Sequence, residues 1–354
     1  MPEIVILIAD LYLAHDAPLA EAAPRGALPG IESAARFGER ASLAHGWRAW
    51  LAASLGRADL AAAAPASIAA VTADMGRCAS PAPAAAVSAA GTRTRWIATP
   101  LELRATQART HLEHRGILRL PLEQLAELAE SFRESFASSG FALAPLPSGD
   151  FLLETPGIAA VPTTEPARWA GGDVAEGLPR GPAAAPLRRF LSELEMWLHG
   201  QELNEARRRR GEPPVTTLWP WGAAGQPLLP ERREAPARPA AFGSDAYLGG
   251  LWQLLGGACR ALPERLEDIA ATSSSSGAVL VVEIAGELRR RAEGTLADAM
   301  AGLDARFVSP ALEALRRGEV NGVTLIANDM RVTVNRRSHL RLWRRGRAGL
   351  ESFA

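Results

Sequence analysis

Three apolar runs of the sequence end beside polar side chains that could contact a ligand. These polar residues are Asp10, Glu283 and the pair Asn328-Asp329, at the ends of runs 4–9, 278–284 and 322–327. Continuous apolar runs of this length are typical of strands buried on both faces, which belong mostly to parallel sheets. Ligands of open α/β sheets bind outside the carboxyl ends of such strands. We therefore predict an α/β fold with these polar groups along one sheet edge.

The histidines offer a second kind of chemistry, metal binding, but their spacing supports it poorly. None of the six forms a His-x-x-x-His pair. His111 and His114 lie three apart on a predicted helix, where they could share a face and bind a metal ion. The interpretation we favour is a polar helix surface. His15 lies near Asp10, either as a fragment of a site or in a solvated loop.

The composition excludes several reactions. The chain has 354 residues with no net charge, and its 39 basic residues are all arginine. The absence of lysine excludes Schiff-base catalysis, a lysine general base and a Walker-type phosphate loop. Cys78 and Cys259 are far apart in the sequence, so we expect neither a disulfide framework nor a thiolate metal site. No apolar run approaches the roughly 20 residues of a membrane span, so we expect a cytoplasmic protein with no membrane partner.

The elements that must position these residues form a core and an insert. Apolar spacing predicts helices at 122–138, 187–210 and 295–317 and short strands at 141–143, 151–154 and 215–219. We predict that residues 1–117 and 186–354 form the α/β core, a mostly parallel sheet flanked by helices. Residues 118–185 then form a small inserted α+β domain.

The most distinctive motif runs from residue 193 to residue 225. It reads Glu193-x-x-Met196-x-Leu198-His199, then Asn204-x-x-Arg207-x-x-x-Gly211, then Trp219-Pro220-Trp221-Gly222-x-x-Gly225. This motif resembles the central signature of archaeal-type cofactor-independent phosphoglycerate mutases. It is also similar to that of bacterial regulatory proteins of the RpfE type. Leu28-Pro29-Gly30 and residues 96–101 and 121–131 match in the same order.

The resemblance implies an alkaline-phosphatase-like core that holds two divalent metal ions with Asp and His ligands. It makes Asp10 and Asp329 metal ligands and His339 the remnant of another. Met330 stands where the family has a histidine ligand, and a thioether is a poor ligand for Mg²⁺, Mn²⁺ or Zn²⁺. Leu11 likewise replaces a glycine. Two carboxylates and one imidazole do not fill a two-metal site, so we expect a vestigial site and no cofactor, with Mn²⁺ or Mg²⁺ only in an active enzyme.

The resemblance also assigns a nucleophile and a ligand-binding group. Ser67 falls near the family's phosphoryl-accepting serine, although a helix N-cap is the simpler interpretation. Asn204, Arg207 and Gly211 keep the family pattern. An arginine fork suits a phosphate or carboxylate, and the alternative is a structural helix end.

These observations favour a regulatory or degenerate phosphoglycerate-mutase-like protein that binds a phosphorylated metabolite or a protein partner. The first alternative is an active metal-dependent mutase or phosphatase with an atypical site built on Asp10, Ser67 and Asp329. A remote alternative is a nucleic-acid-associated protein. It rests on seven arginines between residues 331 and 347, a run without an acidic residue. A solvated, basic terminal segment explains the same arginines, so we expect no nucleic-acid partner.

Overall fold

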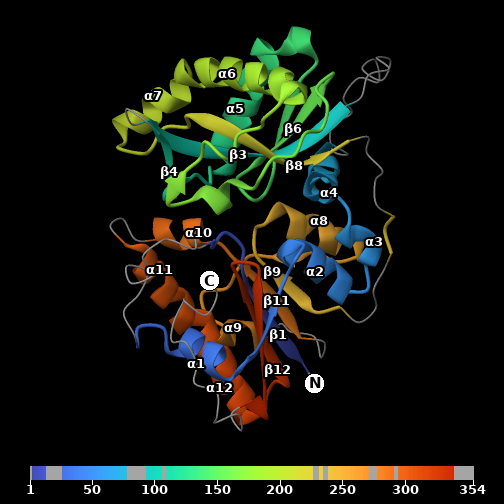
Figure 1. Ribbon diagram of the computed structural model, residues 1–354, viewed down its shortest axis with the longest axis vertical. Coiled ribbons are helices and arrows are strands. Elements are labelled where there is room, and N and C mark those ends of the chain that lie inside the picture. The colour runs from blue at the N-terminus through green and yellow to red at the C-terminus, as the bar shows by residue number, and fades with distance from the viewer. Residues whose placement is uncertain are drawn as a thin grey trace. The chain divides into compact units, whose positions relative to one another are not determined.

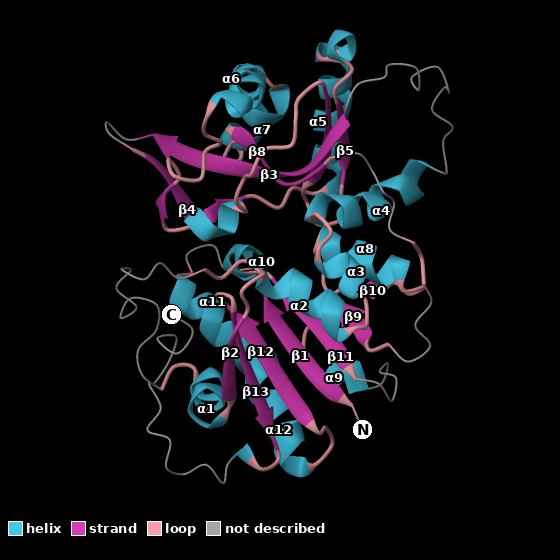
Figure 2. Ribbon diagram, turned by 45° about the vertical axis from the view of Figure 1, so that its right-hand side comes forward, coloured by secondary structure: helices cyan, strands magenta, loops and turns pink. Residues whose placement is uncertain are grey.

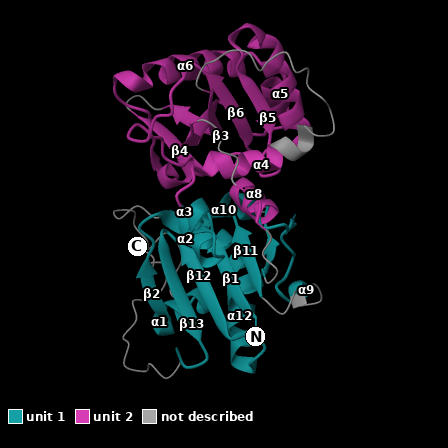
Figure 3. Cartoon of the chain, turned by 90° about the vertical axis from the view of Figure 1, so that its right-hand side faces the viewer, with its two compact units in different colours: residues 1–61, 234–244, 255–354 teal, residues 62–233, 245–254 magenta. Residues whose placement is uncertain are grey.

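The computed structural model describes residues 2–12, 26–77, 93–105, 109–225, 231–233, 238–270, 277–290 and 294–338. The chain divides into two compact units, coloured separately in Figure 3. Unit 1 comprises residues 1–61, 234–244 and 255–354, and unit 2 comprises residues 62–233 and 245–254. Among the described residues, no helix is long and apolar enough to cross a membrane.

Unit 1 is built on a seven-stranded mixed sheet in the order β10-β9-β11-β1-β12-β13-β2. Figure 1 labels its central strands β9, β11, β1 and β12. Its strands are β1 (Glu3–Ile8), β2 (Glu39–Ser42), β9 (Ala240–Phe242), β10 (Cys259–Arg260), β11 (Ala278–Val282), β12 (Gly322–Ala327) and β13 (Met330–Asn335). The strands from β10 to β12 run parallel, whereas β13 is antiparallel to both β12 and β2. The predicted α/β class is confirmed, with a mixed sheet instead of a strictly parallel one.

The apolar runs form the central strands because every residue of β11 and β12 is buried. Ile4, Ile6 and Ile8 project from β1 into one core, where they meet side chains of the helices that cover this face. The helices of unit 1 are α1 (Pro29–Phe37), α2 (Gly46–Ser54), α3 (Ala58–Ala61), α9 (Glu267–Ala270), α10 (Ile284–Arg289), α11 (Leu296–Leu303) and α12 (Ser309–Arg317). A π-helical turn, η6 (Asp304–Val308), joins α11 to α12, so the helix predicted at 295–317 is present with one irregular turn.

Unit 2 contains a second sheet of six strands, five of them in the order β5-β6-β3-β4-β7, with β8 also paired to β3. The strands are β3 (Arg93–Ala105), β4 (Thr110–Ile117), β5 (Ala142–Pro145), β6 (Phe151–Pro156), β7 (Gly172–Asp173) and β8 (Thr217–Ala224). All pairings of this sheet are antiparallel. The 13-residue strand β3 organises the unit, because β4, β6 and β8 all pair with it.

Amphipathic helices cover this second sheet (Figure 2). The helices of unit 2 are α4 (Pro65–Arg77), α5 (Leu122–Ser135), α6 (Ala185–His199), α7 (Glu202–Arg209) and α8 (Ala246–Leu254), with short 3₁₀ turns η3 (Ala137–Ser139), η4 (Pro166–Trp169) and η5 (Pro182–Ala184). Phe132 of α5 packs edge-on against Trp197 of α6, with ring centroids 5.6 Å apart. In α8, a Cβ atom at Gly250 would lie 1.9 Å from the carbonyl oxygen of Ile68, so only glycine allows α8 and α4 to pack this closely.

Three sequence-based expectations differ from the structure. The helix predicted at 187–210 breaks at Gly200 and Gln201 into α6 and α7. The strand predicted at 215–219 is the first part of β8 and belongs to the sheet of unit 2, not to the core sheet. The compact second unit therefore extends well beyond the predicted insert at 118–185, because β3, β4 and β8 belong to the same sheet as β5 and β6.

Candidate functional site

The polar residues that follow the central strands of unit 1 lie at one edge of its sheet, as the sequence predicts. Strand β1 pairs in parallel with β11, where Ile8 faces Val282, and with β12, where Leu7 faces Ile326. These pairings bring the carboxyl ends of all three strands together. Asp10 and the Asn328-Asp329 pair therefore stand beside each other, and the backbone N–H of Asn328 donates to the carbonyl oxygen of Leu11 at 3.0 Å.

Asp10 holds the first turn of a helix. Its Oδ1 accepts a hydrogen bond of 2.5 Å from the backbone N–H of Ile284, and its Oδ2 accepts one of 2.9 Å from that of Ala285. These donors are the first two residues of α10, whose own N-cap, Glu283, makes no side-chain capping bond. Asp10 is 4% exposed. A buried carboxylate at this position satisfies two amide groups that the helix cannot satisfy itself.

Asn328 and Asp329 form the two-residue turn of the β12–β13 hairpin. Their φ angles are 48° and 56°, and Ala327 pairs directly with Met330 across the turn. Positive φ at both central residues defines a type I′ turn, for which Asn and Asp are among the preferred residues. The carbonyl oxygen of Asp329 accepts a hydrogen bond of 2.7 Å from the backbone N–H of Leu43. Turn geometry thus accounts for the residue types at both positions.

The donor set described at this edge does not fit a two-metal centre. Both oxygens of Asp10 accept hydrogen bonds from amide groups, and Met330 begins β13 with a thioether side chain. The side chain of Leu11 is fully buried beside Asp10. Within the described residues, no three His, Cys, Asp or Glu side chains form a group that could hold a metal ion. His339 and His15 lie outside the described residues.

Ser67 is the third residue of α4, not its N-cap, because the helix begins at Pro65. Its backbone N–H donates to the carbonyl oxygen of Ala64 at 3.0 Å, and the residue is partly exposed. Gly222, with φ of 66°, lies against this helix start: a Cβ atom there would be 3.1 Å from Cβ of Pro65. Ser67 belongs to unit 2 and Asp10 to unit 1. The nucleophile assignment therefore stays a prediction.

Asn204 joins two separate parts of the 193–225 motif by three hydrogen bonds. Its Nδ2 donates to the carbonyl oxygens of Leu198 at 2.7 Å and Val215 at 2.9 Å, and its Oδ1 accepts from the backbone N–H of Val215 at 2.8 Å. The residue is 1% exposed. It is the third residue of α7 and does not end a helix. The amide fixes the end of α6 to the segment that enters β8.

Arg207 is buried and holds the loop that follows α7. Its Nε donates to the carbonyl oxygen of Pro213 at 2.8 Å, and its Nη1 donates to Oε1 of Gln124 at 2.6 Å and lies 3.2 Å from a carboxylate oxygen of Glu212. Burial lowers the pKa of the Arg207 guanidinium, and Glu212 partly offsets this by raising it. The described contacts of the guanidinium are internal. Its predicted role as a ligand-binding group is not tested by these contacts and stays a prediction.

Gly211 ends α7 in a Schellman motif. Its φ is 71°, its backbone N–H donates to the carbonyl oxygen of Arg208 at 3.0 Å, and the next amide, of Glu212, donates to that of Arg207 at 2.9 Å. A left-handed residue is required at this position, and glycine adopts that conformation without strain. The spacing from Asn204 to Gly211 is thus accounted for by the structure of one helix and its end.

The two tryptophans of the motif anchor β8 by their indole N–H groups. Trp219 donates to the carbonyl oxygen of Thr164 at 2.8 Å, and Trp221 donates to the hydroxyl of Thr99 on β3 at 2.9 Å. Both side chains are buried. Tryptophan contributes a large apolar surface when its one polar atom finds a partner, as it does here.

The predicted helix that carries His111 and His114 is wrong, because both residues lie on strand β4. The pairing of β4 with β3 is irregular between Leu112 and Ile117, the stretch that contains His114. Burial lowers the pKa of His114, and the nearby His111 lowers it further. The polar-surface interpretation is also wrong for His114, because its Nε2 is buried without a hydrogen-bond partner among the described residues.

The basic segment predicted at 331–347 is described only in its first part. Arg331 lies over the ring of Trp50, 5.8 Å from its centroid, and the Nε of Arg336 donates to the carbonyl oxygen of Val320 at 3.4 Å. Arg337 is exposed, and the arginines from residue 341 onward lie outside the described residues.

Asp304 is another buried carboxylate that holds a helix start in unit 1, and no sequence pattern predicts it. It is 1% exposed and accepts hydrogen bonds from the backbone N–H of Gly30 at 3.0 Å and Ile31 at 2.7 Å, and from the hydroxyl of Ser309 at 2.9 Å. Burial raises the pKa of Asp304, although the three donors oppose this. No local signal marks it, because the donors at Gly30 and Ile31 are more than 270 residues away in the sequence.

No family model matches this chain, and no curated protein matches it. Among solved structures, a cofactor-independent phosphoglycerate mutase from Thermoplasma acidophilum DSM 1728 aligns over 95% of this chain and 90% of its own, with 16% identity and a TM-score of 0.37. The PH0037 protein from Pyrococcus horikoshii aligns over 94% of this chain and 87% of its own, with 11% identity and a TM-score of 0.44. At these TM-scores the likeness transfers no residue role to this chain.

Proposed function

We propose that this chain is a degenerate, phosphoglycerate-mutase-like protein of the regulatory type that acts by binding a phosphorylated metabolite or a protein partner. The observation that carries the proposal is the engagement of both Asp10 oxygens by the amides of Ile284 and Ala285. A carboxylate held this way serves the fold. A cation at Asp10 would share these oxygens with two helix-start amides, and the positive end of the helix dipole opposes a positive ion there.

The neighbouring turn supports the same proposal. Asn328 and Asp329 meet the conformational demands of a type I′ hairpin, and the next side chain is the thioether of Met330. Two-metal phosphoryl transfer needs several hard oxygen or imidazole ligands to stabilise the attacking and leaving oxygens. The described residues at this sheet edge supply no such set.

Direct metal binding and turnover test the proposal. The purified chain is titrated with Mn²⁺ by calorimetry and assayed for phosphoglycerate mutase and phosphatase activity with Mn²⁺ or Mg²⁺. We expect no metal binding tighter than millimolar and no metal-dependent turnover. Turnover that depends on metal, and that is abolished by Asp10→Asn, would overturn the proposal and establish the active-enzyme alternative.

The binding role needs a separate test. Phosphoglycerates and common nucleotides are titrated against the chain, and a pull-down with immobilised protein is compared in the presence and absence of any ligand found. We expect a phosphorylated metabolite to bind at micromolar concentration or a partner to be retained reproducibly. If neither is found and turnover is also absent, the regulatory proposal fails independently of the metal result.

A further inference from the structure

A short strap, residues 166–177, closes one edge of the sheet in unit 2. It contains η4, a turn at Gly171 and the two-residue strand β7, which pairs with the first part of β4. The backbone N–H of Gly171 donates to the carbonyl oxygen of Leu112 at 2.7 Å, and that of Val174 donates to Thr110 at 3.0 Å. Because β7 is so short, the strap can leave the edge of β4 while the longer strands of the sheet stay paired.

The imidazole of His114 lies directly against the turn of the strap. A Cβ atom built at Gly171 would lie 2.9 Å from Cε1 of His114, 3.5 Å from its Nδ1 and 3.9 Å from its Nε2. The edge of the ring that carries both nitrogens therefore faces the backbone of the turn. The φ angle of Gly171 is 87°, a conformation that glycine adopts without strain. Both the close approach and the backbone conformation thus require glycine at this position.

The closed strap suits a neutral imidazole and not a protonated one. Nε2 of His114 is buried without a hydrogen-bond partner among the described residues. A neutral imidazole can leave this nitrogen without a proton, whereas protonation makes both ring nitrogens donors. A buried N–H without an acceptor costs free energy, and a buried charge costs more. Movement of the strap away from the ring exposes it to water, which supplies the missing acceptor.

The charged groups around His114 do not compensate a proton there. Strand β4 packs against β3, β7 and η4. The charged or titratable groups on these elements and on the strap are Arg93, Arg95, Glu102 and Arg104 on β3, His111, Glu113 and Arg115 on β4, and Arg168, Asp173 and Glu176 on the strap, with Glu165 just before it. Arg104 lies 2.8 Å from a carboxylate oxygen of Glu113 and 3.6 Å from one of Glu102. Burial lowers the pKa of His114, and of these groups only His111 adds to the shift, in the same direction.

We propose that the strap is an acid-sensitive catch, in which protonation of His114 releases residues 166–177 from β4 while the rest of unit 2 stays folded. Histidine is the side chain whose ordinary titration falls in the range where such a change occurs. The released strap leaves the carbonyl groups of Thr110 and Leu112 at an open sheet edge. Unpaired backbone groups at such an edge can pair with another strand, so acid controls access to this edge.

Hydrogen exchange of the full chain between pH 7.5 and pH 5.5 tests the catch, with each rate corrected for the intrinsic pH dependence of exchange. The protection factors of the Gly171 and Val174 amides should fall below pH 6.5 by up to about tenfold per pH unit, the limit for one proton taken up on opening. Constant protection of both amides over this range would overturn the proposal.

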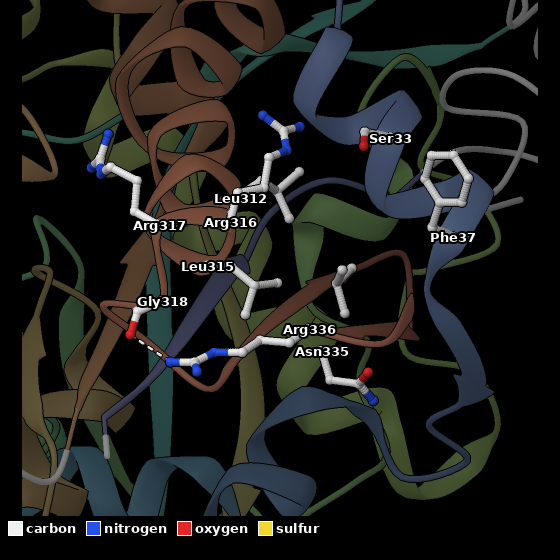
Figure 4. Close-up of a pocket in the computed structure, with 10 residues that line it drawn as sticks. Ser33, Phe37, Leu312, Leu315, Arg316, Arg317, Gly318, Asn335 and Arg336 are labelled. Carbon is white, nitrogen blue, oxygen red and sulfur yellow. Dashed lines mark hydrogen bonds between the residues drawn. The ribbon is translucent and has the colours of Figure 1, made fainter. Parts of the chain in front are cut away.

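The reference amide is that of Gly318 in unit 1, another glycine with positive φ (82°), which donates to the carbonyl oxygen of Leu315 at 3.2 Å. Gly318 and Leu315 line a pocket of about 700 Å³ (Figure 4), and none of the described residues that line this pocket is a histidine. The protection of Gly318 should not change with pH. An equal fall at Gly318 and Gly171 would show a general effect of acid and refute the catch.

Low concentrations of urea separate local opening from unfolding of the whole unit. Unfolding exposes much surface and responds steeply to urea, whereas opening of a strap exposes little and should respond weakly. At pH 5.5, exchange at Gly171 and Val174 should therefore be nearly independent of urea below the unfolding transition. A urea dependence equal to that of the core amide of Phe132 would mean that the strap opens only when unit 2 unfolds, which refutes a local catch.

Three variants locate the trigger, and circular dichroism verifies that each is folded. His114→Gln cannot take up the proton, so protection at Val174 should not depend on pH. Gly171→Ala adds a Cβ atom against the imidazole and strains the turn, so it should lower the protection of Val174 about tenfold already at pH 7.5. Gly157→Ala is the matched control, because Gly157 also has positive φ but no atom lies within 4 Å of its added Cβ; it should leave Val174 unchanged. An unaltered pH dependence in His114→Gln, or equal effects of the two Gly→Ala changes, would refute the proposal.

Discussion

The carboxylate of Asp10 accepts a hydrogen bond from the backbone N–H of Ile284, which lies 274 residues further along the chain. The bond ties the end of β1 to the start of α10, and the backbone of Ala9 donates to Val282 immediately beside it. Aspartate near a helix start is favourable both as a hydrogen-bond acceptor and as a negative charge at the positive end of the helix dipole. Asp10, which sequence resemblance predicts as a metal ligand, therefore stands at a capping position in this structure.

Replacing Asp10 tests this assignment. Asp10→Ala should destabilise the protein by about 2 kcal/mol, because two helix-start amides lose their acceptor. The two amides should also lose protection from solvent: hydrogen exchange at Ile284 and Ala285 should be faster than in the wild-type protein. Asp10→Asn keeps one acceptor oxygen. Its unfolding free energy and its exchange rates at Ile284 and Ala285 should therefore lie between those of the wild-type protein and Asp10→Ala.

The control for this series is Asp268→Asn, at an exposed carboxylate that accepts from the backbone N–H of Arg265 at 3.0 Å. Its effect should stay below about 1 kcal/mol because solvent replaces the lost acceptor. If Asp10→Ala left both stability and exchange at Ile284 unchanged, Asp10 would not be a structural cap.

The position of Asp10 could be predicted from the sequence, but its role could not. The apolar run before it predicts a buried strand, and the parallel-sheet rule places its carboxyl end beside those of β11 and β12. Its hydrogen-bond partners depend on where α10 begins relative to β1. That relation is set by packing between segments more than 270 residues apart, so no local pattern contains it.

A second long-range cap makes Gly30 intolerant of a side chain. A Cβ atom at Gly30 would lie 2.7 Å from Oδ1 of Asp304 and 2.8 Å from the backbone nitrogen of Ser309. The backbone contact cannot move away cheaply, so Gly30→Ala should cost about 2 kcal/mol or more in unfolding free energy, measured by urea titration. Gly286→Ala is the matched control within α10, where the nearest atom is the flexible end of Arg289 at 4.0 Å.

Alanine at position 286 should be neutral or stabilise by up to about 1 kcal/mol, because alanine is the better helix former. Equal effects of the two Gly→Ala changes would contradict the close approach of Asp304 to the start of α1.

The motif around Asn204 predicts a large and specific cost of substitution. Asn204→Ala should destabilise by about 3 kcal/mol, since it leaves the N–H and the carbonyl of Val215 and the carbonyl of Leu198 without their partner. Asn204→Asp should cost more, because a buried carboxylate oxygen would face two carbonyl oxygens where the amide now donates. Thermal unfolding of the two variants checks both the size and the order of the effects. A stable Asn204→Asp protein with altered ligand affinity would instead favour the ligand-binding role.

The largest element that sequence patterns missed is strand β3, together with its partner β4. Pro100 lies within β3, and proline within a run argues against a central strand. Pro100 pairs in register with Leu218 of β8, and its carbonyl oxygen accepts a hydrogen bond of 2.9 Å from the backbone N–H of Leu118. Strand β4 carries charged or histidine side chains at half of its eight positions, so no apolar alternation reveals it. Its stability comes from pairing with β3, a tertiary effect that outweighs local preference.

His114 of β4 makes the stability of unit 2 depend on pH. Its imidazole packs against the backbone near Gly171, where a Cβ atom would lie 2.9 Å from Cε1. Burial, and secondarily the charge of His111, lower the pKa of His114 below its ordinary value of 6.5. The folded protein thus holds fewer protons at this residue than the unfolded chain between pH 6.5 and the lowered pKa. Its contribution to stability is complete above pH 6.5 and is lost as the pH falls through that interval.

Substitution of His114 should remove this dependence. The unfolding free energy of the wild-type protein should fall by up to about 1.4 kcal/mol per pH unit below pH 6.5 through this one residue. Glutamine at position 114 cannot titrate. The difference in unfolding free energy between the wild-type protein and His114→Gln should therefore be constant above pH 6.5, and below it the variant should gain stability relative to the wild-type protein. His111→Gln removes only the charge of His111 and leaves His114 buried. The unfolding free energy of this variant should therefore still fall below pH 6.5, but less steeply than that of the wild-type protein. The measurement is urea unfolding from pH 5 to pH 8, and parallel curves for all three proteins over that range would contradict a lowered pKa at His114.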